Sequence, residues 1–353
     1  MRVTLLISAA ATCLGWANIA IAQTPDSVML DASTSGFYLL QPFYEVDASR
    51  RRAIHHIGLE AIRLENSYVV NSLLDGYPAA LAGIRRGDKI LSVNDQAIES
   101  ELFMNSGIYL NAENGNDSTP TASIKLERDG QTLELTVQPV FENLFDSRRT
   151  AALASIQQFT AGNKTIASFH PWALSRNLSD VLSFTRVIAS IARSDGLILD
   201  LRNSVGFLSK QHLAAFLPAD RTLAGIVGVG NLQTRFDLNE QSLLSRHFGK
   251  PVAILINADT AGGAELLAYF LAELDRITTI GETTAGQLGE FELRGADAEQ
   301  VLHYIPPGDT SINGELLTDL QVEPELPVDY PPTLSTRSDP QFQAAFNLLL
   351  GLI

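Results

Sequence analysis

Cysteine is almost absent from this sequence. The 353 residues contain a single cysteine, Cys13, and it lies inside an apolar N-terminal run that we expect to be removed. The mature chain then has no thiol, so disulfide bonds, cysteine nucleophiles and thiolate metal sites are excluded together. Export to an envelope or extracellular space fits this composition without being required by it.

Basic residues are also scarce. Lysine and arginine number 25 against 40 aspartates and glutamates, which gives a formal net charge of -15. Such a balance argues against nucleic acid and against anionic membrane surfaces as partners.

Long apolar runs are confined to the N-terminus. Arg2 precedes an apolar stretch that ends in Ala20-Ile21-Ala22, and this pattern predicts a secretory signal peptide over residues 1–22. The expected location is therefore periplasmic or secreted. A membrane anchor is the alternative interpretation of this run. No later segment reaches the roughly 18 apolar residues that a membrane-spanning helix needs.

The rest of the chain divides into four parts. Residues 23–54 are polar and predict an irregular segment, and residues 55–140 are rich in strand patterns. In residues 141–335, apolar strands alternate with helical patterns, which favours a mostly parallel buried sheet. Residues 336–353 predict a C-terminal helix with Asp339 as N-cap and Pro340 in the first turn. The strands expected in the two middle parts are 68–70, 90–93, 122–128, 133–137, 165–169, 196–201, 252–256 and 277–280, and the helices are 177–192, 210–216 and 264–274; a loop is expected over 111–121.

One motif in the strand-rich part is specific. The run from Gly76 to Asn94 reads Gly-Tyr-Pro-Ala-Ala-Leu-Ala-Gly-Ile-Arg-Arg-Gly-Asp-Lys-Ile-Leu-Ser-Val-Asn. It resembles the PDZ domains of bacterial envelope proteases, in which a short helix opened by proline and closed by glycine leads into a strand. PDZ domains bind a peptide as an added strand and hold its terminal carboxylate in a loop of backbone N–H groups. The resemblance places that loop at His56, Ile57, Gly58 and Leu59. The alternative is a plain first strand with no competent groove.

Three segments carry a second resemblance. They are Asp195 to Phe207, Pro251 to Leu266 and Ile280 to Gln287, and Val322-Glu323-Pro324-Glu325 closes the series. In order and spacing they are similar to the carboxyl-terminal processing (tail-specific) serine peptidases. The resemblance implies an α/β fold in which a mostly β PDZ domain precedes a crotonase-like peptidase core of parallel strands and helices.

The residues that would perform the family's chemistry are missing. In that family a serine at a strand-to-helix turn attacks the scissile carbonyl, a buried neutral lysine takes its proton, and backbone N–H groups hold the oxyanion. The serine position here is Gly262 and the lysine position is Gln287. Gly206 matches the first glycine of the oxyanion turn, while Phe207 replaces the second.

Two residues remain as substitutes. Thr260 is the nearest hydroxyl, although its counterpart in the family is a structural turn residue. His170, near the end of a predicted strand, is the remaining base candidate, with packing or solvation as the alternative.

Three hypotheses follow. The first is an exported, non-catalytic relative of the tail-specific peptidases that binds peptides or unfolded protein C-termini. The second is an active serine-type or threonine-type endopeptidase with a displaced nucleophile such as Thr260. The third is a structural adaptor whose groove no longer binds peptide. We expect no metal and no cofactor, because the sequence holds neither a zinc-protease motif nor a glycine-rich phosphate loop.

Overall fold

The computed structural model describes most of the chain after residue 28. The described residues are 29–45, 47–65, 67–98, 121–217, 226–227, 247–296, 299–312, 314–334 and 339–353. The predicted signal peptide lies outside these ranges, and so does the predicted loop 111–121 except for Thr121.

The first half is an antiparallel sheet in the order β3-β4-β5-β7-β8, with β6 paired to β5. Its bounds are β3 Leu59–Leu64, β4 Ser67–Leu73, β5 Lys89–Val93, β6 Gln96–Ala97, β7 Ala122–Arg128 and β8 Gln131–Val137, with helix α2 at Pro78–Leu81. The predicted strands 122–128 and 133–137 correspond to β7 and β8, which pair in antiparallel register. The predicted short helix is confirmed too: Pro78 opens α2, and Gly83 follows it at φ 84°. Alternate residues of β7 are buried in the core of this sheet, as a half-buried strand requires.

The second half is built on a six-stranded sheet in the order β10-β11-β13-β16-β17-β22. The strands are β10 Gln157–Ala161, β11 Lys164–Phe169, β13 Gly196–Asp200, β16 Val252–Ile256, β17 Ile277–Gly281 and β22 Leu326–Pro327. From β11 to β22 neighbouring strands are parallel, so the prediction of a mostly parallel sheet is confirmed.

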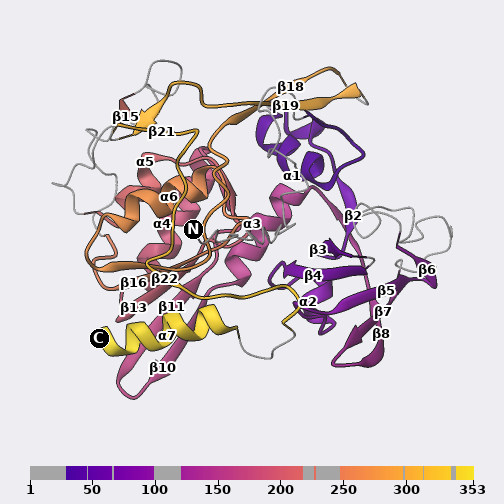
Figure 1. The fold of residues 1–353 in the computed structure, drawn as a ribbon, viewed down its shortest axis with the longest axis horizontal. Helices are drawn as coiled ribbons and strands as arrows, with labels where there is room; N and C mark the ends of the chain where they lie inside the picture. The colour runs from indigo at the N-terminus through magenta and orange to yellow at the C-terminus, as the bar shows by residue number, and fades with distance from the viewer. Residues whose placement is uncertain are drawn as a thin grey trace, which may run out of the picture.

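Helices cover both faces of this sheet (Figure 1). One face packs against α4 (Leu178–Ile191), α5 (Lys210–Ala214) and α6 (Gly263–Ala272), and the other packs against α7 (Pro340–Leu352). Residues of β13 alternate between the two cores: Leu197 and Leu199 lie in the first, and Ile198 packs with Leu349 of α7. Burial on both faces explains why the strands read as continuous apolar runs.

The prediction that residues 23–54 are irregular is wrong over part of this range. Ser35–Tyr44 form helix α1, preceded by strand β1 (Met29–Leu30) and followed by a 3-10 turn, η2 (Ala48–Arg50). The Thr34 hydroxyl accepts a hydrogen bond from the Phe37 N–H and caps the helix. Pro42 inside the helix costs one backbone hydrogen bond, and burial of Phe37 and Leu39 compensates for that loss.

Helix α1 lies against a second small sheet. This sheet has the order β1-β19-β18, with β18 at Glu290–Arg294 and β19 at Val301–Ile305. Figure 1 shows α1 below β18 and β19 and beside α3 (Leu144–Ala154). The remaining short strands are β2 Ile54–His56, β9 Val140–Glu142, β12 Ala173–Leu174, β14 Val205–Gly206, β15 Ile226–Val227, β20 Ser311–Ile312 and β21 Glu315–Leu316.

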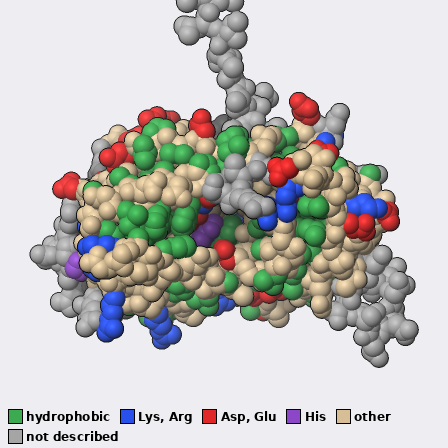
Figure 2. All heavy atoms as spheres, turned by 90° about the horizontal axis from the view of Figure 1, so that it is seen from below, with side chains coloured by type: hydrophobic (Ala, Val, Ile, Leu, Met, Phe, Trp, Pro, Cys, Tyr) green, Lys and Arg blue, Asp and Glu red, His purple; other side chains and the backbone are tan. Residues whose placement is uncertain are grey.

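The two halves are joined by two arginines, of which Arg148 is buried and Arg86 is half-buried. Arg148 of α3 donates to the carbonyl of Asn203 and pairs with Glu60 of β3. Arg86 stacks over the Tyr330 ring at 3.8 Å from its centroid and donates to the backbone carbonyls of Tyr330 and Pro331. Seen from below, the surface is hollowed near the middle, and a histidine side chain is visible in the hollow (Figure 2).

Candidate active site

Gly262 lies at the turn between β16 and α6. It is the N-cap of α6 and has φ 58° and ψ -123°, a combination that is unfavourable for any residue with a Cβ. Its N–H donates to the carbonyl of Gln287 at 3.1 Å. The positions that the resemblance assigns to the nucleophile and to the base are therefore adjacent in space, although 25 residues separate them in the sequence.

A buried carboxylate holds the segment that carries Gln287. Glu265, in the first turn of α6, accepts hydrogen bonds from the Thr284 hydroxyl at 2.5 Å, the Gly286 N–H at 2.8 Å and the Gln287 N–H at 3.1 Å. Burial raises the pKa of Glu265 to about 7, and the three donors act in the opposite direction. Glu265 therefore fixes the backbone at the base position, whatever side chain is present there.

The oxyanion turn lies directly on Gly262 and Gly263. A Cβ on Gly262 would be 2.9 Å from the Gly206 carbonyl oxygen, and one on Gly263 would be 2.3 Å from the Leu208 nitrogen. The turn is held from its other side, because the Phe207 N–H donates to the Leu174 carbonyl at 2.9 Å. The Phe207 amide is therefore occupied, and the Gly206 carbonyl oxygen occupies the space next to the Cα of Gly262.

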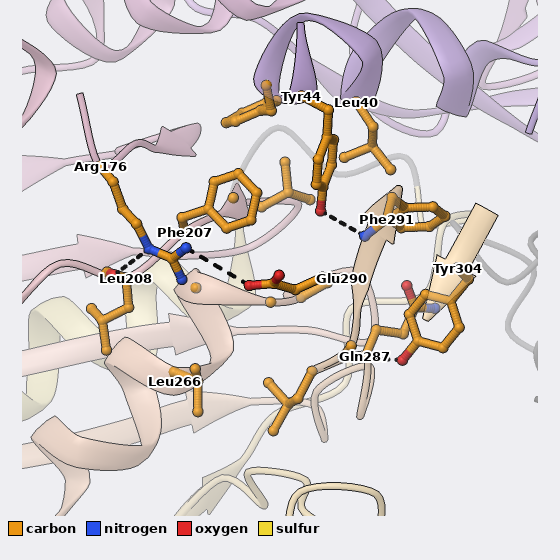
Figure 3. Close-up of a pocket in the computed structure, with 18 residues that line it drawn as sticks. Leu40, Tyr44, Arg176, Phe207, Leu208, Leu266, Gln287, Glu290, Phe291 and Tyr304 are labelled. Atoms are coloured by element: carbon orange, nitrogen blue, oxygen red, sulfur yellow. Dashed lines mark hydrogen bonds and ion pairs between the residues drawn. The ribbon is translucent and has the colours of Figure 1, made fainter. Parts of the chain in front are cut away.

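Gly206, Gly262 and Gln287 line one cavity of about 70 Å³, which we call the site cavity (Figure 3). Its described lining contains no serine, threonine, cysteine, lysine or histidine. The polar side chains are those of Tyr44, Arg176, Gln287, Glu290 and Tyr304. Apart from glycines, apolar and aromatic side chains form the rest of the wall: Leu40, Phe43, Val205, Phe207, Leu208, Ala261, Leu266, Leu288 and Phe291.

Comparison with protein families agrees with this geometry. Residues 156–327 match the model of peptidase family S41, and residues 56–138 match that of the PDZ domain. Residues 156–327 therefore form a peptidase family S41 domain. A carboxy-terminal-processing protease of Bartonella bacilliformis is 27% identical over 289 residues, covering 78% of this chain and 62% of that protein. A carboxyl-terminal-processing protease of Synechocystis is 30% identical over 169 residues, covering 45% of this chain and 38% of that protein.

The chain thus spans less than two thirds of the length of either relative. A crystal structure described as an S41 protease from Bacteroides fragilis superposes with a TM-score of 0.56 at 16% identity. It covers 85% of this chain and 84% of that one, and it supports the S41 fold.

Thr260, the substitute nucleophile, is not among the residues that line the site cavity of this S41 domain. Its side chain is fully buried, and the hydroxyl donates to the Leu201 carbonyl at 2.9 Å while accepting from the Asn257 N–H at 3.0 Å. This hydroxyl ties the β16–α6 turn to the end of β13.

His170 lies in a different place from the other S41 site residues. It lines a separate polar cavity of about 250 Å³, together with Asp200, Arg202 and residues of the PDZ domain. Its ring stacks on Trp172 with centroids 3.6 Å apart, and Nε2 lies 2.8 Å from the Arg202 carbonyl oxygen. Burial lowers the pKa of His170 while the Asp200 carboxylate 3.9 Å away opposes that shift. The structure therefore does not bring His170 to Gly262.

The proposed carboxylate loop lies at the start of the PDZ sheet. His56, Ile57 and Leu59 are almost completely buried, and Gly58 has φ 74°. The Gly58 N–H donates to Nδ1 of His56 at 3.1 Å, and Nε2 of His56 lies 2.9 Å from the Ser147 hydroxyl. Burial lowers the pKa of His56 to about 4, so the ring is neutral at pH 7. The Gly58 N–H of this loop is therefore already hydrogen-bonded within the protein.

No group of three or more metal-ligating side chains occurs in the described part of the S41 and PDZ domains. Among the same residues, no helix is long and apolar enough to cross a membrane.

Proposed function

We propose that this protein is a non-catalytic member of peptidase family S41, exported from the cytoplasm, that binds peptides or protein C-termini through its PDZ domain. One observation carries the proposal: the site cavity holds the backbone positions of the family's nucleophile and base but neither of the side chains. Glycine has no nucleophilic atom, and glutamine is not a base at neutral pH. In a serine protease, loss of these groups costs about six orders of magnitude in turnover.

The surrounding scaffold supports the same interpretation. Glu265 holds the segment of Gln287, and the Gln287 carbonyl accepts the N–H of Gly262, so the turn keeps its place without the catalytic groups. Thr260 uses its hydroxyl within the turn, which favours a structural role over that of a displaced nucleophile.

The PDZ sheet supports peptide binding. Strand β3 stands at the edge of the sheet order, with β4 as its neighbour in the described residues. An edge strand presents backbone N–H and C=O groups with which an extended peptide pairs. The loop of residues 56–59 immediately precedes this strand, where a peptide's terminal carboxylate would lie.

The first test is hydrolysis. We expect the mature protein to leave unfolded casein, and a peptide with an apolar C-terminal residue, uncut during a prolonged incubation monitored by mass spectrometry. A homologous active S41 peptidase provides the positive control. Reproducible cleavage that survives repeated purification would refute the proposal, and its loss in Thr260→Ala but not in Thr260→Ser would identify Thr260 as the nucleophile.

The second test is binding. A labelled peptide with a free, apolar C-terminus should bind at least tenfold more tightly than the same peptide with an amidated C-terminus, because the amide removes the charge that the loop would hold. Fluorescence anisotropy measures both affinities. Equal or undetectable binding of the two peptides would exclude carboxylate recognition and favour the structural adaptor.

Export has its own test. The N-terminal pattern predicts that the protein isolated from the envelope or medium begins at Gln23. Intact-mass measurement of the expressed full chain distinguishes this from a retained N-terminal anchor.

A further inference from the structure

The site cavity has a wall that does not belong to the peptidase core. Leu40, Phe43 and Tyr44 of α1 line the same space as Gly262 and Gln287. Figure 3 shows α1 above the cavity, with the Leu40 and Tyr44 side chains pointing down from it. Tyr44 lies between Phe207 and Phe291 of β18. The N-terminal segment therefore lies over the site at which a peptide would be processed in an active relative.

Phe207 provides the contact for this helix. Its ring centroid lies 5.3 Å from that of Tyr44 and 6.1 Å from that of Phe43, both in edge-on geometry. On its other side the guanidinium of Arg176 lies 4.6 Å from the ring centroid. Glycine, which the family pattern has at this position, could make none of these contacts, so the substitution joins the oxyanion turn to α1.

Tyr44 also occupies a backbone group of β18. The phenol oxygen accepts a hydrogen bond from the Phe291 N–H at 2.9 Å. Strand β18 is the outer strand in the order β1-β19-β18, so an extended peptide that added to it would need outward-facing backbone groups of this kind. A side chain of the protein itself already holds one of them.

The helix is held firmly in this position. Gln41 is fully buried; it donates to the Arg50 carbonyl at 3.1 Å and to the Gln300 side chain at 3.2 Å, and it accepts from the Arg52 N–H at 3.0 Å. Gln300 in turn donates to Glu45 at 3.0 Å. Strand β1 precedes the helix and pairs with β19.

We propose that α1 is a permanent internal occupant of the former substrate cleft, fixed there by Phe207 and Tyr44, so that peptide reaches the PDZ domain and not the cleft. This inference rests on the proposed non-catalytic function and extends it. The cleft is then closed as well as lacking its serine, and restoring the catalytic residues alone does not let a peptide reach the site cavity.

The scarcity of cysteine makes the closure measurable. In a Cys13→Ser background, Gln287→Cys places the only thiol of the chain in the wall of the site cavity. Thr132→Cys, on the exposed side of β8, is the matched control. With a bulky maleimide, we expect the thiol at 287 to react at least a hundredfold more slowly than the thiol at 132. The combined Phe207→Gly and Tyr44→Ala substitutions should bring the two rates within about tenfold of each other, whereas Tyr44→Phe, which keeps the ring, should change the rate little.

Labelling measures access and not turnover, so its result is independent of the hydrolysis test. Equal rates at 287 and 132 in the otherwise unaltered chain would show an open cleft and overturn the proposal. If the thiol at 287 still reacts slowly in the Phe207→Gly, Tyr44→Ala variant, and circular dichroism shows that variant to be folded, then α1 is not what blocks the maleimide.

Hydrogen exchange tests the same point without altering the cleft. The Phe291 amide should be protected in the free protein, and a peptide that binds the PDZ domain should leave exchange over residues 287–291 unchanged. Fast exchange of the Phe291 amide, or new protection of that amide on adding peptide, would contradict the proposal. This measurement uses the unaltered chain, so it tests the proposal even if the Phe207→Gly, Tyr44→Ala variant fails to fold.

Discussion

The Gly262→Ser substitution is the most direct test of how closely the Gly206 carbonyl is packed against Gly262. The new side chain would sit on a backbone at φ 58° and ψ -123°, and its Cβ would lie 2.9 Å from the Gly206 carbonyl oxygen. Backbone strain of this kind costs about 1–3 kcal/mol, and forcing extra atoms into a packed site costs a further 1–3 kcal/mol or so. We therefore expect the free energy of unfolding to fall by about 2–6 kcal/mol, and the midpoint of thermal unfolding by roughly 10 °C.

The assay is urea unfolding of the wild-type chain, Gly262→Ser, Gly262→Ala and a control glycine. Gly130, in the β7–β8 turn, has φ 73°, and a Cβ added there would have no other atom within 4 Å, so Gly130→Ala measures the backbone effect alone. That control should lose about 1–2 kcal/mol. Alanine and serine at 262 should behave alike, because the clash begins at Cβ.

Two results would refute this reasoning. A loss at Gly262 no larger than at Gly130 would mean that the Gly206 carbonyl moves away at little cost. Peptide hydrolysis by the Gly262→Ser, Gln287→Lys double variant would mean that the turn and the cleft can still receive a substrate. The first result concerns the oxyanion turn and the second concerns the whole site, so the two failures are distinguishable.

Three further outcomes are expected. Because the pKa of Glu265 is raised to about 7 in the folded protein, the folded state holds this proton more tightly than the unfolded state. The contribution of Glu265 to the free energy of unfolding should therefore be complete below about pH 4.5 and should decline by up to roughly 3 kcal/mol as the pH rises to 7. In Glu265→Gln this part of the pH dependence, measured by urea unfolding, should vanish. An unchanged dependence of the free energy of unfolding on pH in that variant would contradict the prediction. Arg86→Ala should destabilise the chain by about 2–3 kcal/mol through the lost stacking on Tyr330 and lost hydrogen bonds. The Arg85→Ala variant, at the exposed neighbouring residue, should have almost no effect in the same urea assay; equal effects of the two substitutions would argue against a role of Arg86 between the domains. Thr260→Ala should cost about 1–3 kcal/mol and Thr260→Ser much less, because serine keeps the buried hydroxyl; an equal loss in both would indicate that the methyl group matters instead.

Local patterns were sufficient to predict the elements that carry the site. The apolar strands 196–200 and 252–256 and the helix after Gly262 lie where their sequences indicate, because continuous apolar runs and turn residues are local signals. The family resemblance assigns Gly262 and Gln287 to one site, and in the structure the Gly262 N–H donates to the Gln287 carbonyl.

Contacts between distant residues were not predictable. Helix α1 was missed because Gly36 and Pro42 disturb its helical pattern, and its stability comes from packing on β18 and β19, about 250 residues later in the chain. The surroundings of His56 likewise include a distant residue, because its Nε2 lies 2.9 Å from the hydroxyl of Ser147, 91 residues away. Nor does local sequence reveal that the Gly206 carbonyl lies over Gly262.

Phe207 and Gly262 are coupled through one turn, and this leads to a last prediction. The bare Cα of Gly262 allows the Gly206 carbonyl to approach, and the Phe207 ring holds the same turn against Tyr44 and Phe43. Phe207→Gly should cost about 1–3 kcal/mol by itself, since it removes aromatic contacts and adds backbone freedom.

Gly262→Ser and Phe207→Gly combined should lower the free energy of unfolding by less than the sum of their separate effects. Once the Phe207 ring is gone, residues 206–208 are free to move away from the new Cβ at 262, which relieves the strain that Gly262→Ser introduces. A double-mutant cycle in urea should give an interaction energy of about 1 kcal/mol or more in the compensating direction. Additivity within about 0.5 kcal/mol would mean that the Leu174 carbonyl, not Phe207, fixes the turn. A compensating energy would instead mean that the loss of the nucleophile and the closure of the cleft depend on each other, because each stabilises the arrangement that the other requires.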